Sequence, residues 1–159
     1  MCIWKFNSLV RWILICGVLT GLPLNAQSRK TQAQHLVDLT VKKHPEITGL
    51  EVSAALPGQE RCVTIASTNV KDLGEKCDKD EAIALKTLEP FVEHEPDGFD
   101  VTAPLHDATG KLIGTLGIDF KLHAGQTRAD IVRRTATILK EMEQQIPSKA
   151  YLFESASGA

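Results

Sequence analysis

Aromatic side chains are scarce in this 159-residue chain, where they make up 5% of the residues. Both tryptophans, Trp4 and Trp12, lie within the first 26 residues, and Tyr151 is the single tyrosine. The chain beyond residue 26 is therefore poor in the rings that build aromatic cages around cationic ligands. We do not expect an aromatic cage for an amine or an amino acid.

An excess of positive charge is also missing. Beyond residue 26 the chain carries 16 basic and 20 acidic side chains, a formal charge of −4. A mildly acidic domain has no electrostatic attraction for a phosphate backbone or for anionic lipid. Nucleic-acid binding is therefore excluded from the expected functions.

Beyond residue 26, no apolar run approaches the roughly 20 residues that cross a bilayer. Within the first 26 residues, Lys5 and Arg11 precede an apolar run over residues 12–24, and the small residue Ala26 follows. This order is typical of a secretory signal peptide. We predict a signal peptide over residues 1–26 and a periplasmic or secreted protein without a membrane span after cleavage. The alternative is an uncleaved N-terminal segment that anchors the protein to the membrane.

Cysteines are few, and only Cys62 and Cys77 lie beyond residue 26. An even number of cysteines in an exported chain indicates a disulfide. Such a bond would close a loop of about 15 residues and stabilise the fold by roughly 3 kcal/mol in the chain-entropy model. The alternative is two separate thiols. A redox role is less favoured, because no Cys-x-x-Cys pattern is present to lower a thiol pKa.

Familiar catalytic and metal-binding patterns are absent from the sequence. It contains no Gly-x-Ser-x-Gly, no phosphate loop before a helix and no His-Glu-x-x-His. The five histidines show no i, i+4 spacing, and His94, which lies between Glu93 and Glu95, is in a solvated acidic turn. We expect no catalytic residues, no metal, no cofactor and a protein that is not an enzyme.

The first half of the chain predicts a helix followed by a β-hairpin. Residues 30–44 place apolar side chains along one stripe, and Pro45 ends the helix. Residues 47–56 then alternate, with Leu50 and Val52 on one side and Glu51 on the other. A turn and a second β-rich run over residues 61–68 complete the hairpin.

The second half predicts a helix, another hairpin and a final helix. Asp78 or Asp80 can cap the middle helix, and Thr127 opens a capping box for the last one. The predicted ranges are a loop at 69–78, a helix at 81–89, an acidic connector at 93–98, strands at 99–106 and 111–121, and a helix from 127 that Pro147 terminates.

Two hairpins are stable when they join into one antiparallel sheet and pack against helices. The order of elements therefore predicts an α+β fold with long N- and C-terminal helices flanking an antiparallel sheet. We expect one domain over residues 27–150 and a flexible tail over residues 151–159.

The segment 101–120, Val-Thr-Ala-Pro-Leu-His-Asp-Ala-Thr-Gly-Lys-Leu-Ile-Gly-Thr-Leu-Gly-Ile-Asp-Phe, resembles the closing hairpin of Cache domains. These are PAS-like extracytoplasmic sensor modules of bacterial receptors. The shared features are an apolar strand with Ala-Pro, a turn that ends in Gly-Lys, and a glycine-rich strand that ends in Gly-x-Asp. The resemblance implies a PAS-like sheet and a small-ligand site.

Asp119 matches the aspartate that accepts hydrogen bonds from a ligand ammonium in amine-binding Cache domains. On the predicted strand, Thr115 and Gly117 share a face with Asp119. A glycine inside a strand often marks a bend or close approach by a ligand or backbone. We therefore take Asp119, Thr115 and Gly117 as candidate ligand-binding residues. The alternative for Asp119 is a strand-end carboxylate that pairs with a surface lysine.

Together with the predicted signal peptide, the resemblance implies an exported, stand-alone Cache-like sensory or binding module for a small ligand. Such a module would act through a partner protein, or through a homodimer formed by the terminal helices. One alternative is a ligand-free periplasmic protein with an interaction or structural role. A small redox protein or a hydrolase is the less favoured alternative.

Overall fold

The computed structural model describes residues 30–121 and 123–156, so the predicted signal peptide at 1–26 lies outside the described residues. In chain order the elements are α1 (Gln32–Lys43), β1 (Ile47–Ala55), β2 (Cys62–Ser67), the 3₁₀ turn η1 (Val70–Asp72), α2 (Lys79–Thr87), β3 (Phe91–His94), β4 (Gly98–His106), β5 (Leu112–Lys121), α3 (Arg128–Glu143) and the 3₁₀ turn η2 (Lys149–Phe153). None of the described helices is long and apolar enough to cross a membrane.

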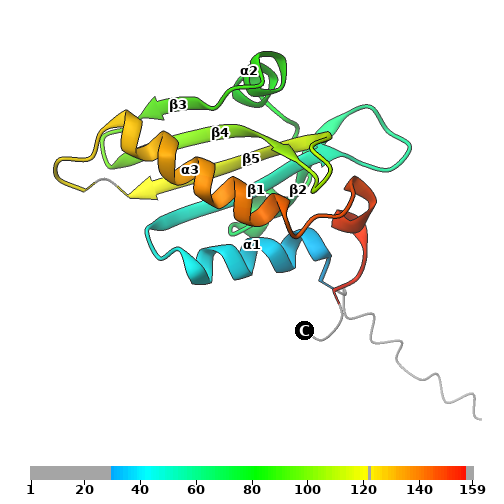
Figure 1. The fold of residues 1–159 in the computed structure, drawn as a ribbon. Helices are drawn as coiled ribbons and strands as arrows, with labels where there is room; N and C mark the ends of the chain where they lie inside the picture. The colour runs from blue at the N-terminus through cyan, green and yellow to red at the C-terminus, as the bar shows by residue number, and fades with distance from the viewer. Residues whose placement is uncertain (1–29, 122, 157–159) are drawn as a thin grey trace, which may run out of the picture.

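The five strands form one sheet in the order β2-β1-β5-β4-β3, and every pair of neighbours is antiparallel. Both predicted hairpins are present, and β1 pairs with β5 to join them. The predicted α+β class with an antiparallel sheet is therefore confirmed. Figure 1 shows the strands running across the molecule, with α3 in front of them.

One face of the sheet carries the hydrophobic core. Helix α1 packs against β1 and β2, while α3 packs against β3, β4 and β5. Because side chains alternate along a strand, every second residue of the central strands points at these helices. The core includes Leu36, Val37, Leu50, Val52, Val101, Leu105, Leu116, Ile118, Phe120, Ile131, Ile138, Met142 and Ile146.

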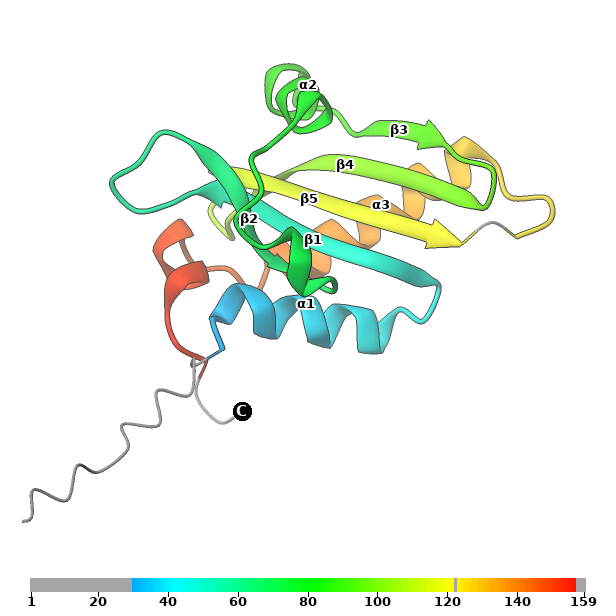
Figure 2. The same ribbon diagram turned by 180° about the vertical axis from the view of Figure 1, so that it is seen from behind.

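The other face of the sheet is covered only in part. Figure 2, the view from behind, shows α2 above β4 and the short η1 turn in front of β1. Residues of β1, β5 and β4 line this face between α2 and η1. These are the residues that strand alternation assigns to the face away from α1 and α3, and several are acidic.

Local sequence accounts for the placement of α2 and α3. Asp78 caps α2 and forms a capping box with Glu81, and Thr127 does the same for α3 with Asp130. In each box the cap and the third helical residue satisfy backbone N–H groups that the first helical turn leaves free. Of the two caps that the sequence allows for α2, Asp78 and Asp80, the structure uses Asp78.

A disulfide joins Cys62 at the start of β2 to Cys77, the residue before the α2 cap. The predicted Cys62–Cys77 bond is therefore confirmed. The segment before Cys77 also pairs with β2 through a bridge between Val63 and Lys76.

The segment before β4 is more ordered than the sequence indicated. Part of the predicted acidic connector belongs to β3, which pairs with β4 from Phe91↔Thr102 to His94↔Phe99. The free edge of β4 supplies these hydrogen bonds, and no local pattern reveals that edge.

The predicted flexible tail at 151–159 is also too long. Leu152 is buried, Ser155 pairs with Thr31, and the backbone N–H of Ala156 donates to the carbonyl of Lys30. Contacts with the start of α1 therefore hold the tail through residue 156. Residues 157–159 lie outside the described part of the chain.

Candidate functional site

A cavity of about 290 Å³ lies on the face of the sheet opposite α1 and α3. By volume it holds roughly ten water molecules, which suits a small ligand. Its floor comes from β1, β5 and β4, and its walls come from the segment around η1 and the N-terminal end of α2. The lining residues are Thr48, Gly49, Leu50, Glu51, Ser67, Thr68, Asn69, Asp72, Asp78, Asp80, Glu81, Asp100, Thr102, Gly117 and Asp119.

The floor is a small grid set by strand register. One row runs across the three strands as Gly49, Asp119 and Asp100, because Asp119 is opposite both of the others. The next row is Glu51, Gly117 and Thr102, with Gly117 opposite both of its neighbours. The floor therefore carries three carboxylates. Across the β1–β5 pair, Glu51 lies opposite Gly117 and Asp119 lies opposite Gly49.

The two floor glycines provide the space in which these carboxylates lie. A Cβ at Gly49 would sit 2.0 Å from Oδ2 of Asp119, and a Cβ at Gly117 would sit 2.8 Å from Cγ of Glu51. Any other residue at either position would push the opposite carboxylate away from the sheet. The glycines thus allow Asp119 and Glu51 to lie across the neighbouring strand.

The wall carboxylates are held by hydrogen bonds from the protein itself. The backbone N–H of Asp78 donates to Glu81 Oε2 over 2.7 Å, and the Ser53 hydroxyl donates to Glu81 Oε1 over 3.4 Å. The Asn69 side-chain amide and the Ser67 hydroxyl donate to Asp72 over 2.8 and 3.2 Å. These carboxylates are positioned before any ligand arrives.

The floor carboxylates differ from those of the walls. Among the described residues, the side chains of Glu51, Asp100 and Asp119 accept no hydrogen bond and form no ion pair. Asp100 and Asp119 are also directly opposite each other on neighbouring strands. Like charges in that arrangement repel, so the floor lacks a counter-charge.

Burial and mutual repulsion raise the pKa of each carboxyl group on this floor. Burial, followed by the charge of Glu81, raises the pKa of Glu51 to about 7. Burial, followed by the charge of Asp119, raises the pKa of Asp100 to about 6. The pKa of Asp119 is also raised, first by burial and then by the charge of Glu95.

On the wall, burial is the main reason that the pKa of Glu81 rises to about 7. The pKa of its neighbour Asp78 is lowered instead, chiefly by the hydrogen bond between the two side chains. The cavity therefore contains several carboxyl groups that change charge near neutral pH.

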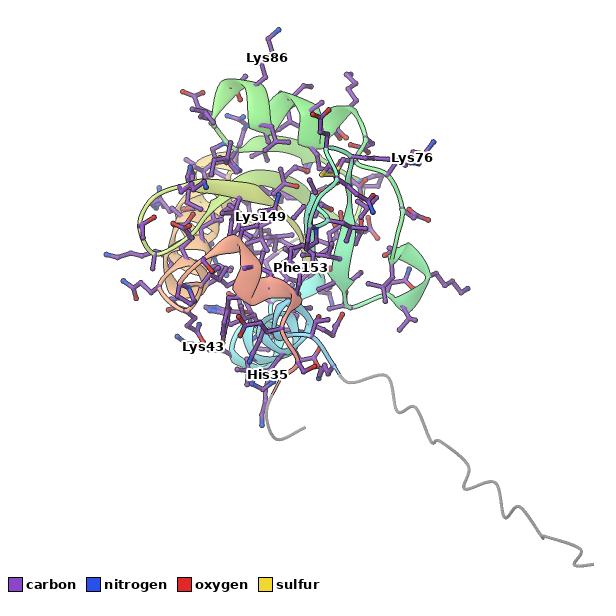
Figure 3. All side chains as sticks on the ribbon, turned by 90° about the vertical axis from the view of Figure 1, so that its right-hand side faces the viewer. His35, Lys43, Lys76, Lys86, Lys149 and Phe153 are labelled. Atoms are coloured by element: carbon purple, nitrogen blue, oxygen red, sulfur yellow. A yellow bond between two sulfur atoms is a disulfide. The ribbon has the colours of Figure 1, made fainter. Side chains whose placement is uncertain are left out.

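The chemistry of the lining favours a positively charged ligand. The described lining contains seven acidic residues and no lysine, arginine, histidine or aromatic residue. In Figure 3, Lys76 and Lys86 point away from the body of the protein. In the part of the chain that the structure describes, no three His, Cys, Asp or Glu side chains are grouped as metal ligands. Carboxylates at separate positions suit N–H donors on an organic cation.

The structure places two of the three predicted ligand-binding residues in this cavity. Asp119 and Gly117 lie on its floor, and no described lysine pairs with Asp119. Thr115 shares their face of β5 but does not line the cavity. It is 1% exposed, and its hydroxyl has no hydrogen-bond partner among the described residues.

Sequence reasoning missed most of the cavity. Glu51 was assigned to the polar side of its strand, and Asp100 occupies the equivalent side of β4. The only sign of this part of the cavity in the sequence was an acidic residue on the polar side of a strand. It does not show which strands are neighbours, so the grouping of these acids with Asp78 and Glu81 could not be read from the sequence.

No protein-family model matches this sequence, and no curated protein matches it. Among solved structures, the fold is similar to a type II free methionine-R-sulfoxide reductase from Thermoplasma acidophilum, with a TM-score of 0.56 and 16% identity over 79% of this chain and 94% of that one. It is also similar to a GAF sensor protein from Burkholderia vietnamiensis, with a TM-score of 0.53 and 16% identity over 75% of this chain and 76% of that one. These likenesses establish a related fold.

The comparison contradicts the prediction that the protein is not an enzyme. One of the two similar structures is named as a reductase and the other as a sensor. The fold therefore hosts both catalytic and sensory proteins, and the lack of a familiar catalytic motif gives no ground for excluding an enzyme.

Proposed function

We propose that the domain is a small-ligand sensory module whose cavity binds an organic cation with primary ammonium or guanidinium groups. The unpartnered carboxylates of Glu51, Asp100 and Asp119 on the cavity floor are the observation that supports it most strongly. A bound ammonium would supply the counter-charge and the hydrogen bonds that the described residues do not provide.

The layout of the floor favours a ligand with two cationic groups. Glu51 lies on β1 and Asp100 on β4, with β5 between them. Neighbouring strands are about 4.8 Å apart, so the two acids arise from backbones separated by roughly 10 Å. A short diamine, or an amine with a guanidinium group, can pair with both ends of the floor. A quaternary ammonium lacks N–H donors and would find no aromatic ring in the described lining.

The wider role proposed for the module rests on the sequence. The predicted signal peptide and the Cys62–Cys77 disulfide suit an exported protein in an oxidising compartment. We propose that the ligand-bound state is presented to a partner protein or a second copy through α1 and α3. Membership of the Cache family stays a prediction, as do export and the partner.

Calorimetric titration with putrescine tests the proposed ligand class. The purified protein is expected to bind putrescine and agmatine, and to bind neither choline nor succinate. Replacing Asp119→Asn keeps the side-chain shape and removes its charge, so it is expected to weaken putrescine binding at least about tenfold, which corresponds to about 1.4 kcal/mol.

The control for this experiment is Glu60→Gln, which makes the same change of charge at an exposed position outside the cavity. It is expected to bind putrescine as the unmodified protein does. Equal weakening by both variants would mean that only net charge matters. Failure of both amines to bind at millimolar concentration would disprove the cation proposal.

A further inference from the structure

The Cys62–Cys77 disulfide encloses one wall of the cavity and immediately precedes the other. Ser67, Thr68, Asn69 and Asp72 lie inside the loop that the bond closes. Asp78, Asp80 and Glu81 begin at the residue after Cys77. The bond therefore ties the end of the first wall and the start of the second to β2, in addition to the hydrogen bonds that Thr68 and Glu81 make with β1.

Apart from the disulfide, backbone hydrogen bonds to a single strand hold the returning part of this loop. The N–H of Thr64 donates to Glu75 and the N–H of Gly74 donates to Thr64, each over 2.9 Å. The N–H of Cys77 donates to the carbonyl of Cys62 over 3.3 Å. All of these bonds involve β2, which is an edge strand of the sheet.

Few apolar contacts support the loop. The η1 turn has no buried residue, Val70 is 76% exposed and Leu73 is 43% exposed. The main core lies on the opposite face of the sheet, between the strands and helices α1 and α3. A segment with little buried apolar area opens at a lower free-energy cost than the core does.

Cys77 also lies directly before the N-terminal cap of α2. Asp78 directly follows it, caps the helix and supplies the N–H that holds Glu81 Oε2. The rest of α2 is held by the sheet, through β3, β4 and β5. Release of Cys77 would therefore loosen the acidic first turn of α2 more than its remaining turns.

We propose that the Cys62–Cys77 disulfide is a redox control of the cavity, a form of regulation that rests on the proposed function. A dithiol reductant donates two electrons and two protons, the S–S bond breaks into two thiols, and the reductant becomes a disulfide. Both cysteines are partly exposed, so a small dithiol can reach the bond. Reduction frees the two acidic walls and weakens ligand binding while the core remains folded.

The test is a putrescine titration of the oxidised protein, of the protein reduced with dithiothreitol, and of a Cys62→Ser/Cys77→Ser double variant. Reduction and the double substitution are expected to weaken binding by the same factor, at least about tenfold. In both cases the walls must become ordered when the ligand binds, and this ordering reduces the binding free energy. Dithiothreitol should not change binding by the double variant, which controls for Cys2 and Cys16 in the predicted signal peptide.

Amide hydrogen exchange in the oxidised and reduced protein separates the possible outcomes. Faster exchange at residues 69–72 and 78–81, with unchanged exchange in β5, is expected. Equal affinity and equal exchange in both states would overturn the redox proposal, and so would faster exchange in β5, because the bond would then maintain the whole fold. If the oxidised protein binds no amine, the cation proposal fails, whereas the exchange result still decides whether the disulfide controls the walls.

Discussion

Replacing Gly114→Ala is expected to lower the free energy of unfolding by about 3 kcal/mol, the upper part of the range for overpacking in a core. A Cβ at this position on β5 would lie 2.2 Å from the backbone carbonyl oxygen of Ser53 and 3.2 Å from Cβ of Ala54. The Ser53 oxygen belongs to the neighbouring strand β1, so relief requires the two strands to move apart. Urea denaturation measures the effect, and with a slope near 1.5 kcal/mol/M the midpoint should fall by about 2 M.

Gly117→Ala is the matched control on the same strand. Its Cβ would meet Cγ and Oε1 of Glu51, at 2.8 and 3.0 Å, and a side chain can rotate where a backbone cannot. We expect a stability loss below about 1 kcal/mol together with weaker putrescine binding, because Glu51 leaves its place on the floor. Equal destabilisation by both variants would contradict this account of the sheet.

Between roughly pH 5 and pH 8, the free energy of unfolding of the ligand-free protein is expected to fall by about 2 kcal/mol, after discounting for solvent screening. The pKa values of Glu51 and Glu81 are raised to about 7 and that of Asp100 to about 6. In this pH range the unfolded carboxyls have lost protons that the folded protein retains. Unfolding therefore releases protons, and stability falls as the pH rises. Urea denaturation at several pH values checks the direction and size.

The Glu51→Gln/Asp100→Asn double variant tests the origin of this slope. The two substituted side chains stay neutral at every pH. The free energy of unfolding of this variant should therefore depend less on pH, and at pH 8 it should exceed that of the unmodified protein. Glu60→Gln should leave the profile unchanged. Putrescine favours the ionised carboxylates, so its affinity should rise over the same pH range in which stability falls. A stability that rises from pH 5 to pH 8 would contradict the assignment.

Local signals in the sequence were sufficient for most of the secondary structure. Alternation of apolar residues predicted both hairpins, Pro45 marked the end of α1, and the capping pattern at Thr127 located the start of α3. The last helix ends at Glu143, earlier than the position of Pro147 predicted. Each of these signals acts within a few residues of chain. The strand β3 was missed because its stability depends on the edge of β4, to which it pairs.

The cysteine pair was also predictable from sequence, because two cysteines beyond a predicted signal peptide have one partner each. Their position beside the cavity was not. That position depends on the path of the chain from β2 through η1 to Asp78, which brings the loop over the face of the sheet.

The sequence by itself determined the α+β class, the two hairpins and the disulfide, and the resemblance to Cache domains pointed to Asp119, which lies in the cavity. The tertiary structure decided that Glu51, Asp100 and Glu81 share that cavity, although they come from β1, β4 and α2. Strand periodicity specifies the face on which a side chain lies, whereas strand order specifies its neighbours. Strand order follows from packing the whole core. Because that packing depends on contacts between distant parts of the chain, only the tertiary structure shows that carboxylates without counter-charges lie next to one another.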